Sequence, residues 1–184
     1  MNVLILLAHP NLPESRINAT LRDAVRELSG VHVHDLYSAY PDGFIDVARE
    51  QELLLAHDVI VMQFPMYWYS TPPLLKAWQD AVLTHGWAYG SKGVALAGKS
   101  LLIAVSIGGD QAGYGREHGQ FTLTELLRPL EATACFCSMK FLGHVAHGAE
   151  DTDLHERLPD MAQSYRALMQ RLVAGDLPPV VDSR

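Results

Sequence analysis

Short apolar runs alternate with amphipathic segments along the whole chain. Continuous apolar runs occupy residues 3–8, 59–64 and 101–107, and residues 31–37 alternate between apolar and polar positions. A continuous run of this length predicts a strand covered on both faces, and alternation predicts a strand with one polar face. The stretch "CFCSMKFL" at residues 135–142 predicts the last strand.

Amphipathic segments with helical spacing separate these runs. In the first, Ile17, Leu21 and Val25 recur at helical intervals, Ser15 is placed to cap the start, and Gly30 suits the end. Further helices are predicted over about residues 46–57, from Pro73 onwards, from Thr122 through "LLRPLEAT" with Pro129 bending the helix, and over residues 154–173. The segment "HGWAYGSKGVALAGKS" is predicted to be irregular.

Strand and helix therefore alternate five times. Such alternation predicts an α/β protein with a parallel sheet and helices on both faces. Five strands in 184 residues favour a flavodoxin-like three-layer sandwich with strand order 2-1-3-4-5. We expect a single domain over residues 1–184.

The composition excludes several classes of function. The formal charge is −7 and Lys and Arg form no cluster, which argues against a nucleic-acid partner or a polybasic membrane contact. The first apolar run has no basic leader, so it favours a buried strand over a signal peptide. No run approaches the length of a membrane span. Cys135 and Cys137 are expected to be buried, reduced thiols in a cytoplasmic protein.

Three unusual loops follow the first, third and fourth predicted strands. They are "HPNLPESRIN", "PMYWYSTP" and "SIGGDQAGYGREHG". In an open parallel sheet, ligands bind beyond the carboxyl ends of the strands, where the strand order reverses. The three loops are therefore expected to meet at one ligand site.

The first loop leads into the amino end of a helix. Free backbone N–H groups and the helix dipole attract an anion there, and Ser15, Arg16 and Asn18 add donors. Neither G-x-x-x-x-G-K-[ST] nor G-x-G-x-x-G follows the first strand, which disfavours a nucleotide triphosphatase and a Rossmann NAD site. The alternative is a simple Ser-capped helix with a surface asparagine.

The second loop places four bulky side chains, Met66 to Tyr69, between prolines. Aromatic and sulfur-bearing groups can stack on a flat heteroaromatic ring while backbone amides bind its polar edge. The alternative is that these rings pack under the next helix or into a subunit contact.

The third loop combines a glycine pair with two titratable side chains. Gly108 and Gly109 allow close approach of the backbone to a ring edge, and Tyr114 and His118 offer a phenolic donor and an imidazole. Lone residues of these types also occur at solvent-facing positions. Their convergence with the other two loops favours a functional role.

The strings "LYSAYPDGFID", "WYSTPPLLKAWQDAVLTHGWAYG" and "LLRPLEATACFC" are long and specific. Through them the chain resembles the flavodoxin-like NAD(P)H:quinone oxidoreductases, and within these the ancillary proteins of glutathione-regulated potassium efflux systems. The resemblance runs from about "ILLAHP" to Leu142.

This resemblance implies a bound FMN, with FAD as the alternative, and NADH or NADPH as co-substrate. His9, Ser15, Arg16, Ile17 and Asn18 would hold the phosphate and ribityl chain, Met66, Tyr67, Trp68 and Tyr69 would line the ring, and Ser106, Ile107, Gly108 and Gly109 would bind its polar edge through backbone groups. His144 and His147 have the spacing of metal ligands but no accompanying partners, and no metal is expected.

The resemblance also implies catalytic roles for Tyr114 and His118, which would assist transfer between nicotinamide, flavin and a quinone-like acceptor in a two-electron, ping-pong reaction. It implies a homodimer and, as a further partner, a membrane potassium efflux antiporter. The protein would then be cytoplasmic and peripheral at the inner face of the membrane. A purely regulatory subunit that docks on the antiporter and holds a structural flavin is the alternative function.

Overall fold

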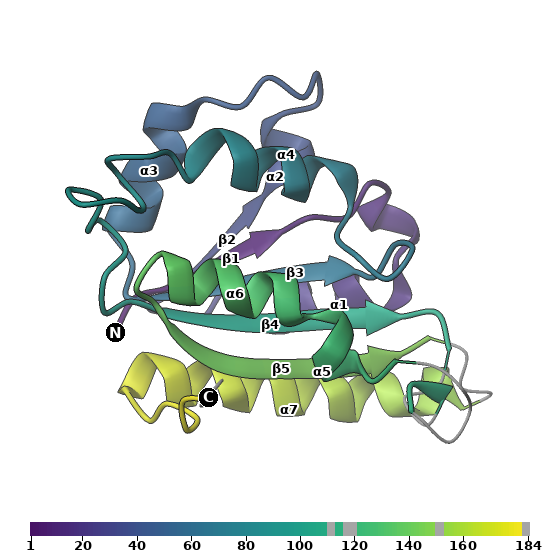
Figure 1. Cartoon of the computed structure of the whole chain (residues 1–184). Coiled ribbons are helices and arrows are strands. Elements are labelled where there is room, and N and C mark those ends of the chain that lie inside the picture. The colour runs from purple at the N-terminus through teal and green to yellow at the C-terminus, as the bar shows by residue number, and fades with distance from the viewer. Residues whose placement is uncertain (110–112, 116–120, 150–152, 182–184) are drawn as a thin grey trace.

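The computed structural model describes residues 1–109, 113–115, 121–149 and 153–181. Their core is one parallel sheet in the order β2-β1-β3-β4-β5, which confirms the predicted topology (Figure 1). Its strands are β1 (Val3–Leu7), β2 (Val31–Asp35), β3 (Val59–Pro65), β4 (Ser100–Ile107) and β5 (Lys140–Gly148).

The register of the sheet brings three loops to one edge. Leu7 at the end of β1 pairs with Gln63 of β3, and Pro65 pairs with Ser106 near the end of β4. The segments after β1, β3 and β4 therefore leave the sheet at the same rim, as parallel pairing requires.

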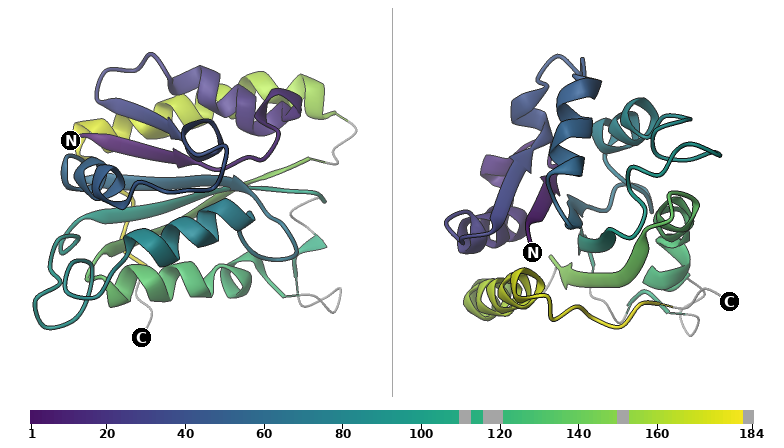
Figure 2. Two further views of the ribbon diagram at one scale, coloured as in Figure 1. Left: turned by 90° about the horizontal axis from the view of Figure 1, so that it is seen from above. Right: turned by 90° about the vertical axis from the view of Figure 1, so that its left-hand side faces the viewer.

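Helices cover both faces of the sheet (Figures 1 and 2). One face carries α1 (Arg16–Val25) and α7 (Leu154–Ala174), which contact each other. The other face carries α2 (Leu36–Ala39), α3 (Val47–Leu55), α4 (Pro73–Val82), α5 (Leu123–Leu126) and α6 (Arg128–Phe136). A short 3-10 helix, η1 (Leu12–Glu14), precedes α1. Within the described residues no helix has the length and apolar composition to cross a membrane.

Each layer of helices encloses its own apolar core. Every residue of β1, β3 and β4 is buried, as continuous apolar runs predict. Alternate side chains of these strands enter the core under α1 and α7, where Tyr165 is buried, and the core under α3, α4 and α6, where Trp78 is buried. The sheet is thus held in place by a core on each face, and it provides a rigid support for the loops at its rim.

The predicted last strand was wrong in its position. Cys135 and Phe136 belong to the final turn of α6, and the strand begins at Lys140. The short apolar stretch has no period that separates a helix end from a strand. Cys135 consequently lies exposed on the helix, against the expected burial, whereas Cys137 is buried.

Several helix ends also differ from prediction. Pro129 does not bend one helix but lies in the first turn of a new one, α6, with Leu127 between α5 and α6. Helix α1 ends at Val25, and Gly30, with φ +81°, forms the turn into β2 instead. Strand β2 ends at Asp35, whose carboxylate caps α2.

The predicted helix starts are confirmed. Ser15 caps α1, Pro73 opens α4, and Thr122 with Glu125 forms a capping box at α5. Each of these signals acts within one helical turn.

Candidate functional site

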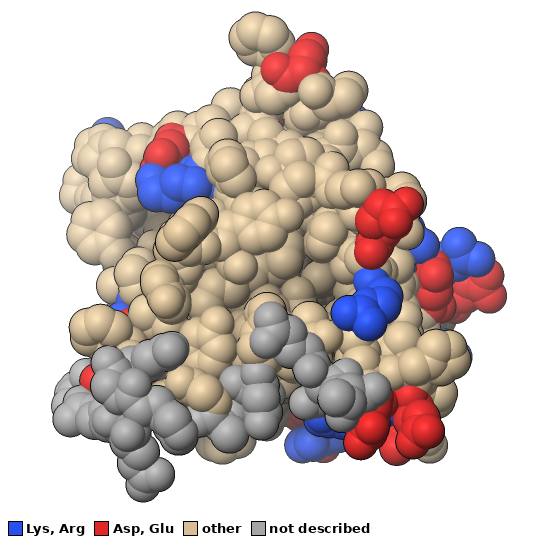
Figure 3. All heavy atoms as spheres, turned by 90° about the vertical axis from the view of Figure 1, so that its right-hand side faces the viewer, with Lys and Arg blue, Asp and Glu red and all other residues tan. Residues whose placement is uncertain are grey.

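A cavity of about 280 Å³ opens at the rim where β1, β3 and β4 end. It is lined by His9, Glu14, Ser15, Arg16, Ile17, Pro65, Met66, Tyr67, Ser106, Ile107, Gly108, Ala149 and Leu154. Nine of the thirteen residues predicted to bind a cofactor belong to this lining. Seen from this rim, most of the described surface consists of residues other than Lys, Arg, Asp and Glu, with charges mainly towards its margin (Figure 3).

The amino end of α1 forms one wall of the cavity. The Ser15 hydroxyl accepts a hydrogen bond from the Asn18 backbone N–H at 3.1 Å, which fixes the start of the helix. The N–H groups of Arg16 and Ile17 lie in the first turn and have no partner inside the helix. The Arg16 guanidinium donates to the Ala149 carbonyl at 3.3 Å. This wall offers donors and positive potential to an anion.

His9 adds an uncharged donor on the β1 side. Its Nδ1 accepts a hydrogen bond from the Asn11 backbone N–H at 3.1 Å, so a neutral ring carries its hydrogen on Nε2. Burial lowers the pKa of His9, and the nearby Asp35 carboxylate offsets this only in part. The imidazole is therefore neutral at pH 7.

The segment after β3 is a strained tight turn. Tyr67 and Ser70 exchange two backbone hydrogen bonds of 3.0 Å, and the two residues between them have positive φ, 49° at Trp68 and 62° at Tyr69. Positive φ at both central positions is the type I′ geometry, in which Asn and Gly are preferred. Large aromatic residues in this conformation indicate a functional constraint.

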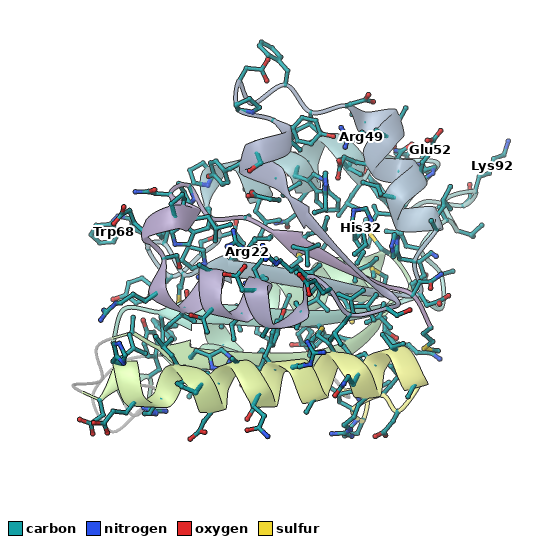
Figure 4. All side chains as sticks on the ribbon, turned by 180° about the vertical axis from the view of Figure 1, so that it is seen from behind. Arg22, His32, Arg49, Glu52, Trp68 and Lys92 are labelled. Carbon is teal, nitrogen blue, oxygen red and sulfur yellow. The ribbon has the colours of Figure 1, made fainter. Side chains whose placement is uncertain are left out.

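The turn presents its aromatic rings outward. Trp68 is 94% exposed and projects from the body of the molecule (Figure 4). Tyr67 lines the cavity, while Tyr69 borders an adjoining hollow of about 140 Å³ between this turn and α6. The predicted aromatic platform is therefore split between the cavity and the open surface.

The two glycines after β4 have open space where a larger residue would place its side chain. A Cβ built on Gly108 or Gly109 meets no atom within 4 Å. Nothing inside the described protein requires a glycine at either position. The space suits a ligand that approaches the backbone closely, and Gly108 lines the cavity.

Asn18 lies beneath the cavity rather than in its wall. It is 1% exposed, and its amide donates to the Ser106 hydroxyl at 2.8 Å. Two further residues, which were not predicted from the sequence, lie in the same hydrogen-bonded series: Gln63 donates to the Asn18 main-chain carbonyl, and Tyr165 donates to Gln63. Gln63 could have been noticed as the one amide in an apolar strand, whereas Tyr165 carries no comparable signal.

Of the two residues predicted to be catalytic, only Tyr114 lies within the described residues. Tyr114 packs partly buried against the core under α4 and α6 and is absent from the cavity lining. His118 lies outside the described residues. Within the described residues no group of three His, Cys, Asp or Glu side chains could hold a metal ion.

Comparison with known proteins places this architecture in a family. A family model described as a flavodoxin-like fold matches residues 1–172. The chain is 50% identical over 177 residues to an uncharacterized NAD(P)H oxidoreductase, YrkL, of Bacillus subtilis, covering 95% of this chain and 99% of the relative.

Two further comparisons cover nearly the whole chain. It is 44% identical to KefF, the ancillary protein of a glutathione-regulated potassium-efflux system of Klebsiella aerogenes, over 93% of this chain and 94% of that protein. It shares 42% identity and a TM-score of 0.89 with the crystal structure of general stress protein 14 from Treponema denticola in complex with FMN, covering 94% and 99% of the two chains. The chain therefore belongs to this family of proteins with the flavodoxin-like fold.

Proposed function

We propose that the protein is an FMN-dependent oxidoreductase that transfers two electrons from NADH or NADPH to a quinone-like acceptor. The observation that carries this proposal is the cavity in which a helix start, an aromatic turn and an open glycine segment meet. The similarity to a solved FMN complex and to a protein named as an NAD(P)H oxidoreductase supports it.

The residues present fit a flavin mononucleotide. The first turn of α1 with Ser15 and Arg16 would hold the phosphate, because an amino-terminal helix turn is a natural anion site. Met66 and Tyr67 would contact one side of the ring, and the backbone at Gly108 would approach its polar edge. FAD stays the alternative.

When bound, FMN would supply the redox chemistry by accepting a hydride equivalent from the nicotinamide and passing it to the second substrate. The chain's own residues would hold the ring and leave one side of it open. Trp68 and Tyr69 offer exposed aromatic surface beside the cavity, on which a flat nicotinamide or quinone can stack. Stacking of both substrates at the same place gives a ping-pong reaction, and Tyr114 and His118 stay proposed proton donors.

An absorption spectrum tests the proposal. Purified protein, or protein supplied with FMN, should show the flavin bands, and NADH or NADPH should bleach them without oxygen until a quinone restores them. Double-reciprocal plots of rate against one substrate should give parallel lines at several concentrations of the other. A protein that retains no flavin and gains none on addition would contradict the assignment.

We infer that the active form is a homodimer. A groove of about 560 Å³ runs between α4 and α6 and is lined partly by Tyr89, Cys137 and Phe136, the last 68% exposed. The rings of Tyr89 and Phe136 lie 4.9 Å apart. The groove adjoins the hollow beside Tyr69, so a second copy seated there would lie next to the active site. Light scattering of the purified protein measures the mass directly, and a monomer at micromolar concentration would oppose the inference.

A regulatory function is the second candidate, because a KefF protein is 44% identical over most of the chain. The protein would then bind a potassium efflux antiporter and activate it, from a peripheral position at the membrane. Potassium efflux should be measured in cells that contain the antiporter, with wild type and with a variant that cannot bind FMN. Full activation by the variant would favour regulation over catalysis.

A further inference from the structure

Four polar side chains below the cavity form one continuous hydrogen-bonded series. The Tyr165 hydroxyl of α7 donates to Gln63 Oε1 at 3.0 Å. Gln63 Nε2 in β3 donates to the Asn18 main-chain carbonyl at 3.0 Å and lies 3.4 Å from Asn18 Oδ1. Asn18 Nδ2 in α1 donates to Ser106 Oγ in β4 at 2.8 Å. The series thus joins α7, β3, α1 and β4.

All four side chains are removed from solvent. Their exposed fractions are 2% for Tyr165, 0% for Gln63, 1% for Asn18 and 8% for Ser106. Burying a polar group without a hydrogen bond destabilises the folded protein, so each buried donor is expected to face an acceptor. The directions of these bonds are therefore determined by the chemistry of the groups.

One backbone carbonyl sets the direction of the whole series. The Asn18 C=O can only accept, so Gln63 must present its NH₂ group there and its oxygen to Tyr165. Because the same NH₂ faces the Asn18 side chain, that side chain presents Oδ1 to Gln63 and Nδ2 to Ser106. Ser106 Oγ is thereby required to accept.

A hydroxyl that accepts from one side keeps its hydrogen for another partner. Ser106 lines the cavity, and within the described residues no hydrogen bond uses its O–H as a donor. A hydroxyl buried to this degree needs an acceptor. The cavity is the place where one can be supplied.

We propose that the Ser106 side chain donates a hydrogen bond to an oxygen or nitrogen lone pair of the bound flavin, and that Asn18 is the positioning residue that aims it. The proposal rests on the proposed FMN function and adds a side-chain contact to the backbone contacts expected after β4. Gln63 holds Asn18 in orientation. Tyr165 only satisfies the Gln63 oxygen and has a structural role.

The proposal predicts different FMN affinities for two variants within the same hydrogen-bonded series. Ser106→Ala removes the proposed donor and should weaken FMN binding by about 3- to 10-fold, the range for one neutral hydrogen bond. Tyr165→Phe leaves the direction of the Asn18 amide unchanged, because the Asn18 carbonyl still orients Gln63. It should lower the unfolding temperature of the apoprotein but leave the FMN Kd within about twofold of wild type.

The experiment is a titration of each apoprotein with FMN, followed by quenching of flavin fluorescence, together with a thermal melt of each apoprotein. Ser106→Thr keeps a hydroxyl and should bind FMN within about twofold of wild type. Ser106→Cys, with a weak thiol donor, serves if the alanine variant fails to fold, and should bind more weakly than wild type. Riboflavin locates the acceptor: an effect of Ser106→Ala that persists with riboflavin places it outside the phosphate.

Two results would overturn the proposal while leaving the FMN function intact. One is an FMN Kd that is unchanged in the folded Ser106→Ala or Ser106→Cys variant. The other is equal weakening by Ser106→Ala and Tyr165→Phe, which would make the series purely structural. A wild-type apoprotein that binds no FMN would remove the proposed function, and this proposal with it.

Discussion

The indole nitrogen of Trp78 on α4 donates a hydrogen bond of 2.8 Å to Oε2 of Glu50 on α3. The other carboxylate oxygen accepts from the Tyr40 hydroxyl at 2.5 Å and contacts Nε2 of His34 at 2.7 Å. Glu50 has no exposed surface. A buried carboxylate thus ties β2, the end of α2, α3 and α4 together on one side of the sheet.

Trp78→Phe should destabilise the protein by about 3 kcal/mol, because it leaves a lone pair of a buried carboxylate unpaired and removes ring volume. Urea unfolding followed by circular dichroism measures this free energy. Trp87→Phe is the matched control, since Trp87 is only partly buried and its indole nitrogen makes no hydrogen bond to any described residue. Its expected cost is below about 1 kcal/mol. Equal losses for the two variants would contradict a special role for the Glu50 contact.

The same carboxylate should make stability depend on pH. Burial raises the pKa of Glu50, but the hydrogen bonds from His34, Tyr40 and Trp78 outweigh it and leave the pKa below its ordinary value. A lowered folded-state pKa gives stability that is complete above the unfolded pKa of about 4.3 and is lost as pH falls through the folded value.

The difference between the free energies of unfolding of wild type and Glu50→Gln should therefore be largest above about pH 5 and should shrink as the pH falls below the unfolded pKa of about 4.3. Urea titrations at pH 3.5, 4.5, 6 and 7.5 measure the difference. A difference that stays constant down to the lowest pH would show that Glu50 does not titrate in this range.

Much of the fold follows from local pattern. Val59–Pro65 and Ser100–Ile107 are almost entirely apolar, a composition typical of strands that are buried on both faces. Alternation with helices then predicts parallel pairing, and the number of strands in a chain of this length favours the flavodoxin-like order. The last strand was misplaced because Cys135 and Phe136 complete a helix whose end is fixed by packing on β5, which no local period reveals.

The candidate site could be predicted as three loops at one rim but not as a set of contacts. The position of Ser15 could be predicted because a helix cap depends on a contact between residues only three positions apart. The bond between Gln63 and Tyr165 joins residues 102 positions apart and depends on how α7 lies across the sheet. Such long-range pairs have no signature in a single sequence.

The aromatic turn after β3 should trade stability for function. Non-glycine residues in the left-handed region cost roughly 1 kcal/mol or more each, and Trp68 and Tyr69 both occupy it. The double variant Trp68→Asn with Tyr69→Gly supplies the preferred type I′ pair and should raise stability by about 1 kcal/mol. Because the exposed rings are removed, the KM for a quinone such as menadione should rise several-fold.

Thermal melts measure the expected gain in stability, and steady-state rates on the same preparations measure the expected rise in KM. Trp87→Phe again serves as a control that removes an indole without altering the turn. A double variant that is less stable than wild type would mean that the rings contribute packing which outweighs the backbone strain.

Ser15→Asp should separate the structural role of the α1 cap from its proposed role in binding. Aspartate caps helices as well as serine does, and its charge is favourable at a helix start, so the apoprotein should be at least as stable as wild type. The same charge repels a phosphate at the amino end of α1, so the FMN Kd should rise by tenfold or more, about 1.4 kcal/mol. Ser15→Ala, which loses the cap without adding charge, should instead cost about 1 kcal/mol of stability.

Riboflavin, which lacks the phosphate, should bind wild type and Ser15→Asp with similar affinity. Equal weakening of FMN and riboflavin would place the phosphate away from α1 and contradict the proposed orientation of the cofactor.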